Sequence, residues 1–204
     1  GGDSTVISFT TSEPIDAATP LLVSLSGANI LAATTTTRAD STHFSFSYTA
    51  GPGDGAATIV LSGGTDSAGN AITAMPTLGG ALTIDNTAPT ITVANPNTAP
   101  AHEKTVTAVA SDGTLTQSVT TGAVCNGTLS FGAYASTTFV SEADNGKRIC
   151  YRAEDPVGNI SFLFSEPIAG IDFTPPAVVA LSLSPDFGTS KIGDAITLSV
   201  TADT

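Results

Sequence analysis

The stretch VVALSLSPDFGTSKIGDAITLSVTADT, residues 178–204, decides the fold. It contains two β-rich runs separated by Pro185, Asp186 and Gly188, residue types that are typical of a turn. The pattern predicts a pair of strands. Two strands alone are marginally stable in water, so we expect another sheet to cover their apolar side chains. These side chains are Val178, Val179, Leu181, Leu183, Ile192, Ile196, Leu198 and Val200.

The composition of the whole chain indicates an all-β protein. Of its 204 residues, 41% are hydrophobic and only 12% are charged, while Thr, Ser, Ala and Gly dominate. Small and β-branched residues favour sheets over helices rich in Glu, Lys and Leu. Eighteen acidic and six basic residues give a net charge of −12, which repels nucleic acids and anionic membranes. No apolar run reaches the roughly 18 to 20 residues of a membrane span.

A short motif occurs twice and reveals an internal repeat. The two copies are Asp66-Ser-Ala-Gly-Asn70 and Asp155-Pro-Val-Gly-Asn159, and each precedes an Asp-x-Thr-x-Pro linker, at 85–89 and 172–176. The copies are about 90 residues apart, close to the size of one small β-sandwich domain. We therefore divide the chain into residues 1–88, 89–176 and 177–204.

The last of these pieces has the sequence of a domain's opening. Its second run closes on Val200-Thr-Ala-Asp203, as the second predicted strand of the middle piece closes on Val109-Ala-Ser-Asp112. The first piece has no such strand pair, and joining Thr204 to Gly1 gives a continuation similar to the one after Asp112. We expect the strand pair of one unit to complete the first domain of a neighbouring unit.

The two cysteines, Cys125 and Cys150, lie in the middle piece. An even number in one segment favours a single disulfide and therefore an oxidising, extracellular location. Two buried free thiols are the alternative. Cys150 alternates with Ile149 and Tyr151, so we expect a bridge on the outer face of its strand rather than in the core.

The repeated loops are candidate calcium sites. Calcium takes six to eight oxygen ligands, and carboxylates, amides and backbone carbonyls of such loops can supply them. In each repeat we expect the loop to approach the aspartate of its linker. The alternative is that the Asp and Asn side chains only stabilise their own turns. The candidate ligands are Asp66, Asn70 and Asp85 in the first repeat and Glu154, Asp155, Asn159 and Asp172 in the second.

We do not expect an enzyme. The two histidines, His43 and His102, lie outside any recognisable nucleophile or metal-ligand motif, and the chain has no Gly-rich phosphate loop. An exposed aromatic platform for carbohydrate or protein ligands is also unexpected, because there is no Trp and the aromatic residues alternate with polar ones, as in Phe44-Ser-Phe46.

Taken together, the Asp-x-x-Gly-Asn loops, the Asp-x-Thr-x-Pro linkers and Lys191-Ile-Gly-Asp-Ala-Ile-Thr-Leu-Ser-Val200 resemble bacterial Ig-like repeat domains of large surface adhesins and related extracellular repeat proteins. The resemblance covers all three pieces. It implies tandem Ig-like antiparallel β-sandwiches joined end to end, with calcium at the junctions and a mechanical or adhesive role at the cell surface.

From these patterns we expect a structural subunit of an extracellular surface filament, in which identical subunits polymerise head to tail by donor-strand complementation. One alternative is a repeat segment of a long calcium-rigidified adhesin stalk, in which the same junction is covalent. Another alternative is a surface ligand-binding module.

Overall fold

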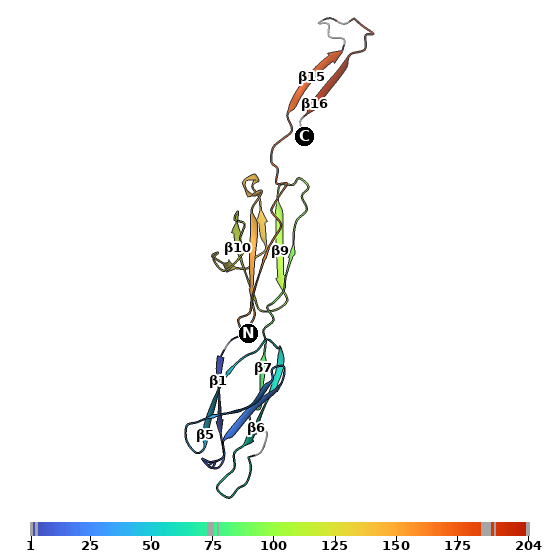
Figure 1. Ribbon diagram of the computed structural model, residues 1–204. Coiled ribbons are helices and arrows are strands. Elements are labelled where there is room, and N and C mark those ends of the chain that lie inside the picture. The colour runs from blue at the N-terminus through green and yellow to red at the C-terminus, as the bar shows by residue number, and fades with distance from the viewer. Residues whose placement is uncertain are drawn as a thin grey trace. The chain divides into compact units, whose positions relative to one another are not determined.

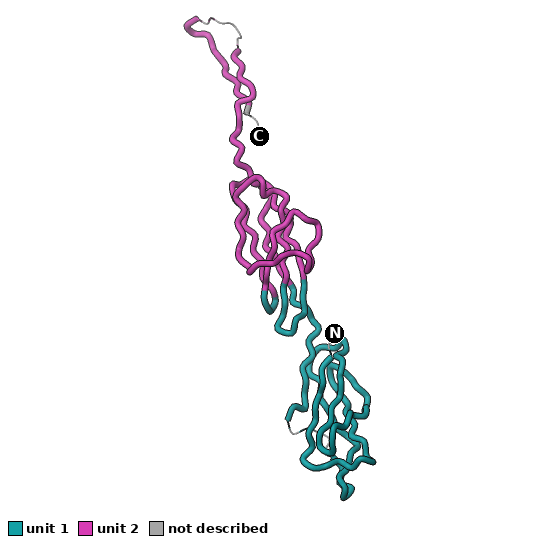
Figure 2. The backbone as a smooth tube through the Cα atoms, turned by 90° about the vertical axis from the view of Figure 1, so that its left-hand side faces the viewer, with its two compact units in different colours: residues 1–90, 111–114, 153–161 teal, residues 91–110, 115–152, 162–204 magenta. Residues whose placement is uncertain are grey.

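The chain is all-β and is built from several antiparallel sheets, as the composition predicts. The computed structural model describes residues 2, 4–72, 76, 78–184, 189 and 191–202. The chain separates into two compact units, formed by residues 1–90, 111–114 and 153–161 and by residues 91–110, 115–152 and 162–204 (Figure 2). The predicted turn at 185–188 and the predicted continuation from 203 and 204 to 1 lie outside the described residues. None of the helical residues described forms a helix long and apolar enough to cross a membrane.

The first unit contains two sheets (Figure 1). One has the order β1-β5-β4, with β1 at Ser4–Thr10, β5 at His43–Thr49 and β4 at Thr37–Arg38. The other has the order β3-β2-β6-β7, with β3 at Leu31–Thr35, β2 at Leu21–Gly27, β6 at Gly55–Gly63 and β7 at Ala81–Ile84.

Residues from both of these sheets form one hydrophobic cluster. Alternation along β5 buries Phe44 and Tyr48 and leaves His43 and Ser47 exposed, because successive side chains of a strand point to opposite faces. The same alternation buries three residues of β2. The buried members of the cluster are Phe9, Ile15, Leu21, Val23, Leu25, Phe44, Tyr48, Ala57, Ile59, Leu61 and Ile84.

The second unit also contains a three-stranded and a four-stranded sheet. The first has the order β12-β9-β8, with β12 at Thr137–Phe139, β9 at Lys104–Ala110 and β8 at Ile91–Ala94. The second has the order β11-β10-β13-β14, with β11 at Gly132–Ala133, β10 at Thr114–Thr120, β13 at Arg148–Glu154 and β14 at Ile160–Phe164. Its buried core residues are Val106, Ala108, Phe139, Ile149, Tyr151, Ile168 and Ile171.

Lys104, at the start of β9, is buried in the second unit with only 3% of its surface exposed. Its Nζ donates hydrogen bonds to the Asn97 carbonyl at 2.9 Å, the Asn97 Oδ1 at 3.2 Å and the Ala99 carbonyl at 2.5 Å. A buried ammonium is costly unless its donors are satisfied. These oxygens satisfy the three donors and hold the segment before β9 against that strand.

The predicted strand pair at the end of the chain forms a two-stranded antiparallel sheet (Figure 1). It consists of β15 at Val178–Ser184 and β16 at Thr197–Ala202, and Leu181 lies opposite Val200 while Leu183 lies opposite Leu198. Directly opposed residues share one face of a sheet, so these four side chains form one apolar face. We call this pair of strands the hairpin.

Candidate functional site

The apolar face of the hairpin is exposed. Leu181 has 64% of its surface exposed, Leu198 59% and Val200 55%. The other apolar residues predicted to be donated are also more than half exposed: Val178, Val179, Leu183, Ile192 and Ile196. A two-stranded sheet is marginally stable alone, and an exposed apolar face of this kind is unusual for a surface in contact with water only.

The hairpin repeats the pattern of the first two strands of the second unit. There, β8 pairs with β9 so that Val93 lies opposite Ala108, and the Ile91 and Val93 side chains pack against the core. Like β8 and β9, the hairpin is an antiparallel pair with alternating apolar residues, but its apolar face is exposed.

The first unit has an open sheet edge at the place that β8 occupies in the second unit. Tyr48 of β5 lies opposite Thr5 of β1, and Phe139 of β12 lies opposite Lys104 of β9. Tyr48 and Phe139 each precede a glycine, Gly55 or Gly146, by the same number of residues, so we treat β1 and β9 as equivalent strands. β9 has β8 on its other side, whereas β1 is the end strand of its sheet among the described residues.

The equivalence of β1 and β9 differs from the match made between the sequences. That match equates the start of the first piece with the residues after Asp112. Those residues form β10, which lies in the other sheet beside β13. If β1 corresponds to β9, then one further strand beside β1 would give the sheet β1-β5-β4 the counterpart of β8 that it lacks.

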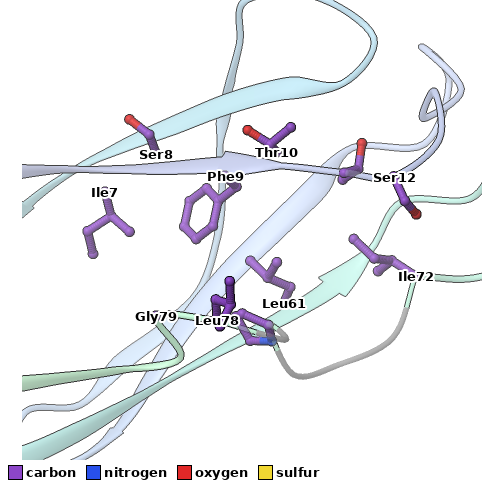
Figure 3. A pocket seen from close by; sticks show the side chains of 11 residues that line it. Ile7, Ser8, Phe9, Thr10, Ser12, Leu61, Ile72, Leu78 and Gly79 are labelled. Atoms are coloured by element: carbon purple, nitrogen blue, oxygen red, sulfur yellow. The ribbon is translucent and has the colours of Figure 1, made fainter.

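A groove follows this open edge. It has a volume of about 560 Å³ and runs along residues 7–12, with Leu61 of β6, Ile72, Pro76, Leu78 and Gly79 on its other side. Figure 3 shows Ile7 and Phe9 pointing toward Leu61 and Leu78, while Ser8 and Thr10 point away from them. We call this feature the β1 groove.

The two Asp-x-x-Gly-Asn loops have the same hydrogen bonds. Asp66 Oδ1 accepts from the Ala68 and Asn70 backbone N–H groups at 2.9 and 2.8 Å, and Oδ2 accepts from Asn70 Nδ2 at 2.8 Å. In the second loop Asp155 accepts from the Val157 and Asn159 N–H groups and from Asn159 Nδ2 at closely similar distances. The glycine of each motif has a positive φ, +88° at Gly69 and +95° at Gly158, which explains why glycine stands there.

These bonds lower the pKa of both loop aspartates. The Asn70 side chain is the largest cause for Asp66. At Asp155 burial raises the pKa, but the hydrogen bonds from Asn159 and Val157 outweigh it and the net shift is downward. Both carboxylates are therefore held in the ionised form by their own loops.

The linker aspartates among the candidate calcium ligands accept hydrogen bonds from their own turns. Asp85 Oδ1 accepts from the Thr87 N–H, and Asp172 Oδ1 from the Thr174 N–H. Asn159, which belongs to the first unit, donates Nδ2 to the Asp85 carbonyl at 3.0 Å. Glu154 ends β13. No group of three or more His, Cys, Asp or Glu residues is arranged to hold a metal in the described part of the chain, and calcium binding stays a prediction.

A carboxylate fastens the linker in each unit. Asp54 accepts from the Asn86 N–H and from the Thr87 hydroxyl, and Glu142 Oε1 accepts from the Phe173 N–H at 2.6 Å and the Thr174 hydroxyl at 3.2 Å. We call these two arrangements the junction clamps. The Thr87 hydroxyl, followed by the Asn86 N–H, lowers the pKa of Asp54.

Further contacts fix the linker of the second unit. The His102 and Phe173 rings stack with centroids 4.8 Å apart. Asn145 donates Nδ2 to the Ile171 carbonyl and accepts from the Ile171 N–H at 2.9 and 3.0 Å. Residues 171–174 are therefore held to their unit by several independent contacts.

The predicted disulfide is confirmed. Cys125 and Cys150 are bonded, and there is no free cysteine. Ile149 and Tyr151 belong to the core cluster while Cys150 does not, as alternation along β13 predicts. Cys150 is nonetheless fully buried, so the bridge lies beneath covering chain rather than on an open surface.

Sequence reasoning missed the junction clamps. Asp54 and Glu142 lie about 30 residues from the linkers that they hold, and each binds one backbone N–H and one threonine hydroxyl of its linker, so no local pattern joins them. A signal was present in the repeat itself, because each carboxylate lies in the Gly-containing turn that precedes β6 or β13. No protein-family model matches the chain, and no curated protein matches it.

Proposed function

We propose that this protein is a structural subunit of an extracellular surface filament, in which identical copies join head to tail through the hairpin. In this proposal each of the two units is an Ig-like β-sandwich formed by its three-stranded and four-stranded sheets. The observation that carries the proposal is the exposed hairpin face, which has the pattern of a core-facing strand pair.

Energetics support a long-lived joint. Each apolar side chain that the hairpin buries contributes roughly 1.5–3 kcal/mol before the cost of ordering the partners. The hairpin presents six such residues, Val178, Val179, Leu181, Leu183, Leu198 and Val200, and the segment between its strands adds Ile192 and Ile196. A surface that binds a different surface on the next copy does not close on itself, so the expected product is a filament.

The disulfide and the junction clamps support the extracellular and mechanical parts of the proposal. A disulfide persists in oxidising compartments. The clamps join the linker threonines, Thr87 and Thr174, to carboxylates of their own units, so that each linker begins in a fixed direction.

One observation favours a second candidate, a repeat segment of an adhesin stalk. If the hairpin corresponds to β8 and β9, then β16 corresponds to β9. β1 also corresponds to β9, because β1 pairs with β5 as β9 pairs with β12. A whole hairpin could join the first unit only by displacing β1. In the stalk, the hairpin would instead open a further Ig-like unit of the same polypeptide.

Association of the full chain tests the proposal. We expect light scattering and electron microscopy to show head-to-tail oligomers that grow with concentration, and Leu198→Asp to prevent them. Ser199→Asp is the matched control, because Ser199 lies on the opposite face of β16 and the charge change is the same. Equal association of the two variants would contradict the proposal.

The size of the denatured native polypeptide separates the two candidates. Filament subunits give a species of 20.2 kDa, the mass of these 204 residues. A stalk gives a much larger species, and the same Leu198→Asp change would then destabilise one unit of a single chain.

A further inference from the structure

We infer that Asn126 is the acceptor of an N-linked glycan, transferred from a lipid-linked sugar phosphate donor. The inference depends on the extracellular location proposed above, because N-linked glycans belong to the surface loops of secreted proteins. It does not depend on the association of copies. Asn126 belongs neither to the hairpin nor to the residues that line the β1 groove.

The chain contains two Asn-x-Ser/Thr sequences, the pattern that an acceptor asparagine requires. They are Asn126-Gly-Thr128 and Asn159-Ile-Ser161. The pattern is common by chance and does not separate the two sites. Their structures do, because the two asparagines differ in the hydrogen bonds of Nδ2, the atom that would carry the sugar.

The first sequence forms a tight turn in the segment between β10 and β11. The Leu129 N–H donates to the Asn126 carbonyl at 3.3 Å. Asn126 Oδ1 accepts from the Thr128 N–H at 3.0 Å and from the Thr128 hydroxyl at 2.6 Å. A backbone N–H can only donate, so the oxygen of the carboxamide faces the turn and Nδ2 lies on the other side of the carboxamide.

The Asn126 Nδ2 is unpaired and accessible. In the described part of the chain it donates no hydrogen bond, and it is not among the buried side-chain atoms that lack a partner. Nδ2 therefore reaches solvent, although Asn126 as a whole is half-buried. The next two residues, Gly127 and Thr128, are exposed. A sugar on Nδ2 would break no hydrogen bond of the folded unit.

The second sequence lacks both of these features. Asn159 Nδ2 donates to Asp155 Oδ2 at 2.8 Å and to the Asp85 carbonyl at 3.0 Å. An N-glycosidic bond replaces one of the two hydrogens of Nδ2, so a sugar there would remove one of these bonds. The Ser161 hydroxyl is buried and has no partner among the described residues, so it does not bind the Asn159 carboxamide.

Two contacts fix the segment that presents Asn126. Its neighbour Cys125 is bonded to Cys150 of β13, and the Phe131 ring packs against Phe162 of β14 with centroids 5.9 Å apart. The turn lies between these two anchors along the chain. The exposure of Asn126 Nδ2 is therefore a property of the folded second unit.

The transfer forms one bond and breaks another. Nδ2 of Asn126 bonds to the anomeric carbon of the sugar, and the bond between that carbon and a phosphate oxygen of the donor breaks. The phosphate leaves with the bonding electron pair, and Nδ2 loses one proton to solvent. Nothing is oxidised or reduced. The donor and the transferase come from the cell that makes the protein.

Tryptic mapping of the protein isolated from the cells that make it tests the inference. After denaturation, reduction and alkylation, trypsin cuts after Lys and Arg, so that Asn126 lies in the peptide 105–147 and Asn159 in the peptide 153–191. We expect the first peptide to carry the added mass of one or more sugar residues, located at Asn126 by fragmentation. The second peptide should have the mass of its sequence alone.

Variants made in the same cells separate the acceptor from its turn. Asn126→Gln should remove the added mass. Thr128→Ala should also remove it, although the backbone N–H that binds Asn126 Oδ1 remains, whereas Thr128→Ser restores a hydroxyl and should retain it. Asn159→Gln is the matched control and should leave the added mass unchanged. The Cys125–Cys150 bridge, mapped without reduction, reports that each variant is folded.

The outcomes distinguish this inference from the proposed function. An unmodified peptide 105–147 in a protein whose disulfide is intact would overturn the inference alone and would leave the Asn126 bonds as those of a turn. A sugar on Asn159 would overturn the distinction between the two sites. Free thiols at Cys125 and Cys150 in the freshly isolated protein would contradict the extracellular location, and with it both proposals.

Discussion

At the scale of single residues, the aspartates of this chain act mainly on backbone N–H groups. Asp66 and Asp155 each satisfy two N–H donors of their own loop, and Asp54 reaches across to the linker. The sequence identified the loop aspartates as candidate ligands with turn formation as the alternative, and their hydrogen bonds are those of turns. The sequence could not identify Asp54 as a residue that binds the linker, because no local pattern indicates which residues it contacts.

Acid should weaken the first junction clamp. The pKa of Asp54 is lowered from 3.8 in the folded state, so on acidification the unfolded state takes up the proton first. The stabilisation is therefore complete above pH 3.8 and is lost as the pH falls through the lower folded-state pKa. We expect Asp54→Asn to flatten the acid side of the stability–pH curve, measured by urea unfolding. Asp16→Asn, in a separate turn of the same unit, is the control.

Calcium provides a second test at this scale. If the loops bind calcium, as the sequence predicts, we expect the unfolding temperature to be higher in calcium than in chelator, whereas an equal temperature would support the alternative that Asp66 and Asp155 only stabilise their own turns. An unfolding temperature that is higher in calcium than in chelator, with the difference abolished by Asp155→Asn, would support the calcium site predicted from the sequence.

At the scale of elements, alternation predicted the strands well. The buried Phe44 and Tyr48 of β5 and the separate faces of Ile149 and Cys150 follow from a period of two. The place of β1 could not be predicted, because strand neighbours depend on pairing across the chain rather than on local pattern. Lys104 was also unpredictable, since a buried ammonium depends on the carbonyls that surround it.

Reduction of the disulfide should destabilise the second unit selectively. Cys125 and Cys150 are 25 residues apart, and a loop of this size contributes roughly 2–4 kcal/mol by restricting the unfolded chain. Hydrogen exchange should therefore show faster exchange in β9 and β13 after reduction, with β5 and β6 as internal controls. Equal acceleration in both units would contradict this local role.

At the scale of the whole molecule, charge opposes association. Each copy carries a net charge of −12, so copies repel one another at low ionic strength. Salt shortens the screening length from about 10 Å at 0.1 M to about 3 Å at 1 M. We expect oligomers to grow as sodium chloride is raised, measured by light scattering, because screening removes the repulsion and leaves the apolar joint. Dissolution of oligomers by salt would show that ion pairs hold the joint instead.

The positions of the six basic residues govern how trypsin would cut the folded chain. Arg38, Lys104, Arg148 and Arg152 lie in strands, and Lys147 is bound to Asp144 next to β13. Lys191 alone is both exposed and outside the strands in the described part of the chain. Cleavage after Lys191 would cut the chain between β15 and β16 and outside the core clusters of both units, giving a protease-made variant in which the tip of the hairpin is severed.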